Sequence, residues 1–108
     1  MKERRKKKLT NLIRNLAARF LEEQSNRTSL ISVTRVDMIK GTDEMLIYLS
    51  IFPNSNEKRA YDFVVRKEFE FRNFVAGNIK TKRLPRFIFK IDLGEKNRQR
   101  IEELLKKS

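Results

Sequence analysis

The chain has 108 residues, of which 26 are Lys or Arg and 14 are Asp or Glu, so its formal net charge at pH 7 is +12. It contains no Cys and no His, which excludes a disulfide framework, a thiolate metal site, a cysteine nucleophile and the commonest general base. No apolar run approaches the ~20 residues that span a bilayer, and no secretory signal follows the N-terminus. We therefore expect one globular domain in the cytoplasm, without a metal or another cofactor.

The N-terminal segment, residues 1–8, holds six bases and a single acid. Blocks of like charge repel one another and often remain unfolded, so we expect a flexible arm that becomes ordered on a bound polyanion. Basic tails can also serve solubility alone, and this alternative stays open. Residues 9–24 follow as an amphipathic helix, because their apolar side chains recur at the helical period. Arg14 on the polar face of this helix would extend the basic surface of the arm.

Two strands are predicted next, over residues 30–39 and 45–52, from their β-branched residues and from the alternation in the second segment. Gly41 in the turn between them can take a positive φ, and such a short connection predicts antiparallel pairing. Tyr48 lies on one face of the second strand, where it either stacks on a base or covers the sheet. The opposite, core-facing side consists of Met45, Ile47, Leu49 and Ile51.

A long helical segment follows Pro53, which ends the second strand. Asn54 and Glu57 have the spacing of a capping box. The apolar stripe of the helix then changes phase between residues 66 and 70, which predicts a kink or two helices that meet at an angle. Since these positions contain no Pro or Gly, tertiary packing has to impose the bend.

Residues 80–90 form the second basic segment, with five bases and no acid. These bases are interleaved with Phe87, Ile88 and Phe89, which predicts a half-buried strand that holds the charges in place. The aromatic side chains that fall at core periods are Phe63, Phe71, Phe74, Phe87 and Phe89.

A last helix is predicted over residues 95–107, with Ile101, Leu104 and Leu105 turned inward. The complete order is then α-β-β-α-kink-α-β-α. It predicts an α+β domain of two layers, in which helices cover one face of a three-stranded sheet and the other face is left largely open.

From about Leu9 to Leu105, the chain resembles the ribosome-binding factor A family, which are bacterial assembly factors of the small ribosomal subunit. Each matching segment is short, but their order and spacing together are specific. The segments are SVTRV at 32–36, IYLSI at 47–51, Phe71-Arg72, LPRFIF at 84–89, and Asp92 followed by RIEELL at 100–105.

The resemblance implies a type II KH-like domain over residues 9–108, preceded by the basic arm. The family has Ala-x-Gly at the kink, whereas this chain has Lys67, Glu68 and Phe69. An ordinary KH domain clamps single strands with a GXXG loop, and no two of the three glycines here are three residues apart. Binding is therefore expected to rely on basic side chains that contact the backbone and shape of a folded RNA.

The candidate RNA-binding residues are the bases of the two segments, of the predicted kink and of the first helix. For those at the kink, ordinary solvated helix charges are an equal alternative. The candidates are Lys80, Lys82, Arg83, Arg86, Lys90, Arg72, Arg66, Lys67, Lys6, Lys7, Lys8, Arg5, Arg4 and Arg14.

The resemblance implies an RNA-binding factor that acts in late maturation and processing of 16S rRNA by binding the immature particle. The expected partners are precursor small-subunit rRNA and the free 30S subunit, bound by a monomer that catalyses no reaction. Three alternatives stay open: a ribosomal protein or general module for structured RNA, a small DNA-binding protein, and a nuclease that uses carboxylates and metal ions alone.

Overall fold

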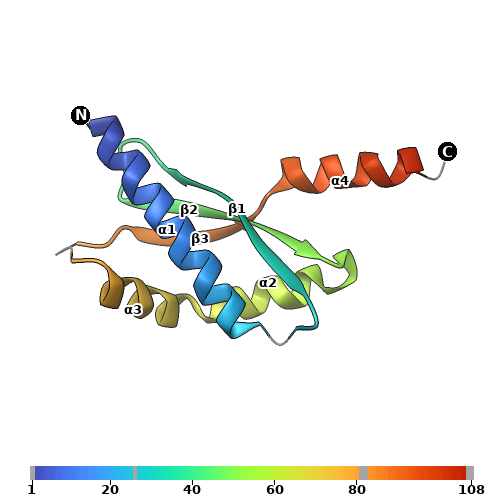
Figure 1. Cartoon of the computed structure of the whole chain (residues 1–108), viewed down its shortest axis with the longest axis horizontal. Helices are drawn as coiled ribbons and strands as arrows, with labels where there is room; N and C mark the ends of the chain where they lie inside the picture. The colour runs from blue at the N-terminus through green and yellow to red at the C-terminus, as the bar shows by residue number, and fades with distance from the viewer. Residues whose placement is uncertain (1, 26, 81–82, 107–108) are drawn as a thin grey trace.

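Figure 1 shows the computed structural model, which describes residues 2–25, 27–80 and 83–106. The order of elements agrees with the prediction, and the α+β class is confirmed. None of the described helices is long and apolar enough to cross a membrane. The elements are α1 (Lys2–Gln24), β1 (Leu30–Met38), β2 (Glu44–Phe52), a single 3-10 turn η1 (Asn54–Asn56), α2 (Glu57–Arg66), α3 (Glu68–Asn78), β3 (Arg86–Ile91) and α4 (Leu93–Lys106).

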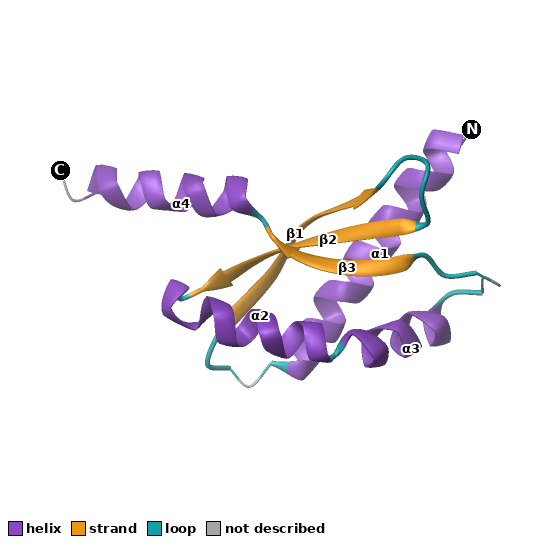
Figure 2. Ribbon diagram, turned by 180° about the vertical axis from the view of Figure 1, so that it is seen from behind, coloured by secondary structure: helices purple, strands orange, loops and turns teal. Residues whose placement is uncertain are grey.

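The three strands form one sheet in the order β1-β2-β3. β1 and β2 pair antiparallel, as predicted, through a turn in which Gly41 has a φ of 82°. β3 pairs parallel to β2 and places Arg86 opposite Glu44, so both strands start at the same end of the sheet. Figure 2 shows α1, α2 and α3 on one side of this sheet, while α4 extends away from it.

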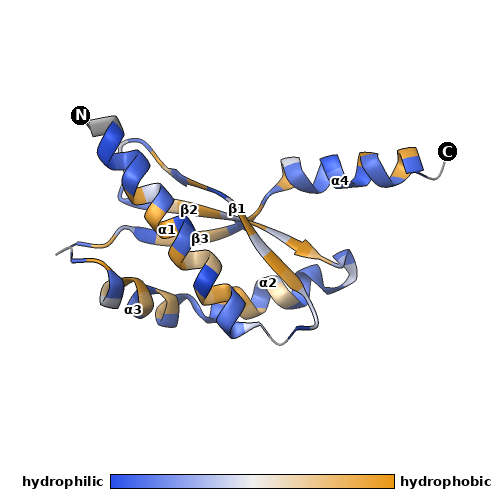
Figure 3. Ribbon diagram, viewed as in Figure 1, coloured by the Kyte–Doolittle hydropathy of each residue, from blue (hydrophilic) through white to orange (hydrophobic). Residues whose placement is uncertain are grey.

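The core lies between the sheet and these three helices. Met45, Ile47 and Leu49 alternate with partly exposed residues along β2 and are fully buried, as their spacing predicted. Phe71 of α3 stands at the centre, with its ring 5.1 Å from that of Phe87 and 5.4 Å from that of Phe89. Figure 3 shows the apolar residues gathered where the helices face the strands. The predicted core assignment of the aromatic residues also holds for Phe63 and Phe74, which pack against this cluster while partly buried.

A β-bulge in β1 was not predicted. The register with β2 shifts between Val33 and Arg35, so one extra residue, Thr34, sits in β1. Strict alternation would place Val33 and Val36 on opposite faces of the sheet. The bulge resets the alternation, and both valines pack against the core.

The predicted kink is present at Lys67, which separates α2 from α3. Its amide donates to the carbonyl of Val64 at 3.0 Å, and its carbonyl accepts from the amide of Phe71 at 2.9 Å. Val64 on one side and Phe71 on the other are both fully buried. The bend therefore lets two helices of different phase face one core, without a Gly at the corner.

The predicted capping box is wrong. Asn54 begins the 3-10 turn η1, and α2 starts only at Glu57, with Asn56 as its N-terminal neighbour and no side-chain cap. The side chain of Asn56 instead donates to the carbonyl of Thr28 at 3.0 Å. This contact ties the start of α2 to the segment before β1, a tertiary interaction that spacing along the chain cannot reveal.

The first helix is longer than predicted, because α1 begins at Lys2 and not at Leu9. The basic residues of the expected separate arm form the first turns of this helix. The prediction placed the boundary where the apolar stripe starts, but Lys and Arg are good helix formers and can continue a helix beyond its packed part.

The last helix differs most from the prediction. Ile101, Leu104 and Leu105 do not point inward: they are 58%, 62% and 69% exposed. α4 is held near its start, where Lys96 pairs with Glu57 at 2.9 Å and Gln99 donates to Ser50 at 3.2 Å. Beyond this anchor it runs away from the domain (Figure 1), which leaves these apolar side chains largely exposed.

Candidate nucleic-acid interface

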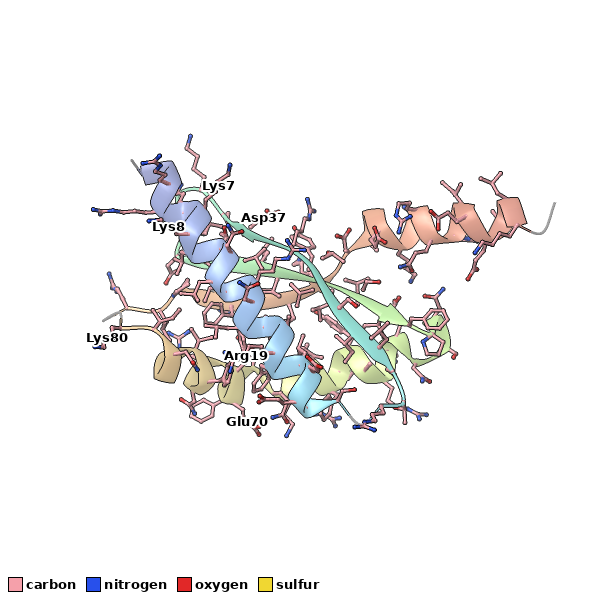
Figure 4. All side chains as sticks on the ribbon, in the orientation of Figure 1. Lys7, Lys8, Arg19, Asp37, Glu70 and Lys80 are labelled. Atoms are coloured by element: carbon pink, nitrogen blue, oxygen red, sulfur yellow. The ribbon has the colours of Figure 1, made fainter. Side chains whose placement is uncertain are left out.

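Three segments that are far apart in the sequence meet at one end of the domain. They are the first turns of α1, the turn between β1 and β2, and the loop from α3 to β3. Figure 4 shows Lys7 and Lys8 of α1 at the same end of the molecule as Lys80, which follows α3. We call this region, defined by Arg4–Lys8, Lys40, Lys80 and Arg83, the basic end.

A hollow of about 690 Å³ lies between the first turns of α1 and the end of β1. Arg4, Lys6 and Lys7 line one side of it, and Val36, Asp37 and Met38 line the other. Asp37 is the acid on this surface, and it is 3.7 Å from the guanidinium of Arg35. The three bases of α1 thus face a concave surface on which one acid already has a cationic partner.

A second hollow, of about 640 Å³, adjoins the first, because Met38 lines both. Its walls include Leu9 of α1, Asp43 of the strand turn, and Arg72, Arg83 and Leu84 from α3 and the loop after it. The two basic segments of the sequence therefore border neighbouring hollows. Arg4, Arg5, Lys6, Lys7, Lys8, Lys80 and Arg83 are all exposed.

Arg72 has a structural role at this end. Its guanidinium donates to the carbonyl of Pro85 at 2.9 Å and to that of Leu84 at 3.3 Å, and the residue is partly buried. These bonds fix the loop that carries Arg83. The sequence predicted Arg72 as an RNA contact, whereas two of its donors are already used to shape the loop.

Lys82 lies outside the described residues. The structure brings together the candidates of α1 and of the loop, but it separates others from them. Arg14 is exposed further along α1, and Lys90 lies on the open face of the sheet, opposite Tyr48 in the register. Arg86 lines a different hollow, beside Val65 and Glu68.

Arg66 and Lys67 lie at the kink, at the far end of α3 from Lys80. Because α3 has 11 residues, the two ends are separated by about 16 Å at 1.5 Å per residue. Lys67 is 3.3 Å from Glu70 and stands 5.6 Å from the centre of the Phe63 ring. For Lys67, the alternative of an ordinary helix charge with its own acidic partner is thus supported.

Tyr48 has one ring face covered. The guanidinium carbon of Arg35 lies 4.1 Å from the centre of this ring, within the range of a cation–π contact. Of the two uses that the sequence left open for Tyr48, the structure supports a cover over the sheet.

Lys40 was missed by the sequence analysis. It is exposed in the turn between β1 and β2, within three residues of Met38 and Asp43, which line the hollows. The signal was weak: it was a single base in a predicted turn, outside both basic segments.

Chemically, the basic end offers exposed ammonium and guanidinium groups around two adjoining concave surfaces. Such groups bind phosphate oxygens and release condensed counterions. Nothing in the described ranges 2–25, 27–80 and 83–106 brings three acidic side chains together as a metal site.

A family model and two known proteins match this chain. Residues 5–105 match the family model described as ribosome-binding factor A. The chain is 31% identical over 100 residues to ribosome-binding factor A of Kosmotoga olearia, covering 92% of this chain and 77% of the relative. It is 30% identical over 109 residues to that of Thermosipho africanus, covering 95% and 86%.

Solved structures resemble the fold. The crystal structure of ribosome-binding factor A from Thermus thermophilus superposes with a TM-score of 0.70 at 22% identity, over 80% of this chain and 93% of that one. The solution structure of a putative ribosome-binding factor A from Thermotoga maritima gives a TM-score of 0.64 at 23% identity, over 80% and 85%.

Proposed function

The chain belongs to the ribosome-binding factor A family, and on this premise we propose that it is an RNA-binding assembly factor of the small ribosomal subunit. It binds the immature particle, with precursor 16S rRNA and the free 30S subunit as partners, and acts in late maturation and processing of that RNA. It works in the cytoplasm as a monomer and catalyses no reaction.

One observation supports the assignment of the basic end as the RNA-binding surface. Arg4, Lys6 and Lys7 of α1 and Arg83 of the loop before β3 are far apart in the sequence, yet they border adjoining hollows. Convergence of separate basic segments on one end is the arrangement expected of a surface that contacts the phosphates of a polyanion. Basic segments that serve only solubility would not need to meet at one end of the domain.

The mechanism is differential binding. The chain has no GXXG loop to clamp a linear single strand, so its bases contact phosphates that the fold of the RNA brings together. A factor can shift an RNA between two conformations only by the difference in its affinity for them. The basic end therefore stabilises the rRNA arrangement whose phosphates match its two hollows.

The test uses cell extracts and two variants of equal net charge. The first carries Lys6→Ala, Lys7→Ala, Lys80→Ala and Arg83→Ala. The control removes four exposed bases far from the basic end, Lys58, Arg59, Arg100 and Lys106. We expect the unchanged chain and the control to sediment with free and precursor 30S particles, and the first variant to remain at the top of the gradient.

Other outcomes would reject the proposal. If both variants lose association with the particles equally, the association depends only on the total charge of the chain. Stable association with mature, translating ribosomes would indicate a ribosomal protein. Preference for duplex DNA over structured rRNA at one fixed salt concentration would indicate a DNA-binding protein, and specific cuts in RNA incubated with Mg²⁺ would indicate a nuclease.

A further inference from the structure

Phe69 is the most exposed large apolar side chain among the described residues, with 73% of its surface accessible. It stands on the first turn of α3, directly after the kink. The other aromatic residue of this turn, Phe71, is fully buried in the core. The fold therefore does not use the ring of Phe69, although an aromatic ring has both faces available for stacking.

A hollow of about 200 Å³ lies next to this turn, between the kink and β3. Glu68, the neighbour of Phe69, lines it together with Val65, Ile88 and Arg86. Arg86 is exposed, and it forms no ion pair within the described parts of the chain. Beside the exposed ring there is thus a small concave surface that combines apolar side chains with one carboxylate, Glu68, and one guanidinium, Arg86.

The outer edge of β3 in this hollow is not open for pairing with another strand. The hydroxyl of Tyr61 donates to the carbonyl of Phe89 at 2.6 Å and so occupies one of the edge acceptors that an added strand would need. Recognition of a peptide by strand addition is disfavoured here, whereas contact with a flat base needs no edge hydrogen bonds.

The exposed face of α3 connects Phe69 to the basic end. Phe69, Asn73 and Ala76 are all exposed and follow one another at the helical spacing i, i+4 and i+7. The helix then leads to Lys80, and its length of 11 residues corresponds to about 16 Å. A strand of RNA whose phosphates contact Lys80 can therefore run along α3 and reach the ring at its other end.

From these observations we propose that Phe69 stacks on an unpaired base of the bound RNA, next to a phosphate held by Arg86. The inference rests on the proposed function and adds to it a single-stranded element beside the folded RNA. Stacking is tolerant of base identity, so the site recognises an unpaired nucleotide rather than a sequence.

The contact at Phe69 and the contacts at the basic end should differ in their dependence on salt, because the charges at the kink are balanced. Arg66 and Lys67 are balanced there by Glu68 and Glu70, and Lys67 already pairs with Glu70. Arg66 and Lys67 therefore add little attraction for phosphates, and the one phosphate contact beside the ring is that of Arg86. Loss of Phe69 should weaken binding without changing its dependence on salt, because stacking releases no counterions.

The chain contains no Trp, so Phe69→Trp introduces a single fluorescent reporter that can still stack. The probes are a labelled RNA hairpin with a single-stranded adenosine tail and the same hairpin with a blunt end. We expect the tailed hairpin to quench the fluorescence of F69W and the blunt one to leave it unchanged. Phe52→Trp is the matched control, and its fluorescence should not be quenched. Phe52 is 59% exposed, but it is the last residue of β2, whereas Arg86 lies beside the first residue of this strand.

Affinity gives the second readout. Phe69→Ala should weaken binding of the tailed hairpin roughly tenfold, with an unchanged salt slope, and should leave the blunt hairpin unaffected. Thermal unfolding should match that of the unchanged chain, because the ring is not buried.

Four results would overturn the inference. If F69W is not quenched while the tailed hairpin binds normally, the stacking contact is wrong and the proposed function stands. Equal loss of both hairpins on Phe69→Ala would reject a base contact. A loss of 30S binding without any loss of RNA affinity would show that the ring docks on a protein. No binding of either hairpin at low salt would overturn the proposed function as well.

Discussion

The hydroxyl of Thr34 donates a hydrogen bond of 2.5 Å to the Oδ2 atom of Asp92. Thr34 is the extra residue in the bulge of β1, and Asp92 follows β3 on the other edge of the sheet, so the bond spans β2. The other carboxylate oxygen accepts from the amide of Glu95 at 3.1 Å, as an N-cap does. The bulge thus fixes the residue from which α4 starts.

The first prediction concerns acid stability. The hydrogen bond from Thr34, followed by that from the amide of Glu95 and the charge of Arg35, lowers the pKa of Asp92. A carboxyl whose pKa is lower in the folded state stabilises the fold above its unfolded pKa of about 3.9 and loses this contribution as the pH falls through the folded value. Urea unfolding should therefore show a steeper loss of stability below about pH 4 in the unchanged chain than in Asp92→Asn.

At pH 7, Asp92→Asn should be less stable by about 1–2 kcal/mol, because it loses a charge-assisted hydrogen bond and part of a cap. Thr34→Val serves as the control, because it removes the donor of the same hydrogen bond and keeps the carboxylate of Asp92. It should lower the stability at pH 7 by a similar amount. Identical acid profiles for the unchanged chain and Asp92→Asn would contradict the assignment.

The second prediction concerns α4. None of its residues in the described part of the chain is buried, and beyond the cap at Asp92 its side chains contact the domain near its start, through Lys96 with Glu57 and Gln99 with Ser50. A chain that ends at Asp92 should unfold with a free energy within about 1.5 kcal/mol of the full chain. Circular dichroism should show the lost helix, and a collapse of the melting transition would mean that α4 packs on the domain in solution.

The second and third strands were predictable because each shows its own periodicity, and the first because of its β-branched residues. Met45, Ile47 and Leu49 alternate without interruption, so the core face of β2 could be read directly. The bulge at Thr34 could not, since it depends on the pairing with β2. For α4, the stripe of Ile101, Leu104 and Leu105 has the period of a packed helix, but periodicity does not tell whether a surface lies opposite the helix.

The site was predictable in its parts and not in its arrangement. Charge clustering marked residues 1–8 and 80–90, yet whether these segments meet depends on how α1 lies against the sheet. Arg72 was predicted only as an RNA contact, because sequence alone does not show that its guanidinium also has acceptors within the fold. Its fixed fork of donors suits the two carbonyls of Leu84 and Pro85, and only the folded loop brings these acceptors within reach.

The third prediction treats Arg72 as a positioning residue. Arg72→Ala and Arg72→Lys should weaken RNA binding by a similar factor, because both lose the paired bonds that hold the loop carrying Arg83. Both should also be less stable by about 1–2 kcal/mol, since the partly buried carbonyl groups of Leu84 and Pro85 lose the paired donors of the guanidinium. Filter binding and urea unfolding provide the two measurements. If Arg72→Lys binds like the unchanged chain and only Arg72→Ala is weakened, the residue contacts phosphate directly.

The fourth prediction concerns the start of α1. Removal of residues 1–8 deletes bases that are exposed from Arg4 onward, while the first residue packed on the core is Leu9. Affinity for structured RNA and the salt slope should both decrease, and the melting temperature should stay within a few degrees. A large drop in the melting temperature would show that these turns support the fold. Replacement of the same bases by Gln keeps the helix and should reproduce the loss of affinity.

The last prediction addresses the loop between α3 and β3. Replacement of Lys80, Lys82 and Arg83 by Ala should weaken RNA binding and flatten its salt slope by roughly one unit for every phosphate that the variant no longer binds. The matched control replaces Lys58, Arg59 and Arg100, which are exposed on α2 and α4, and should retain the slope of the unchanged chain. This comparison separates local phosphate binding from the general effect of net charge, because both variants lose three positive charges. An unchanged slope in the loop variant would reject the basic end as the RNA-binding surface, even if its affinity falls.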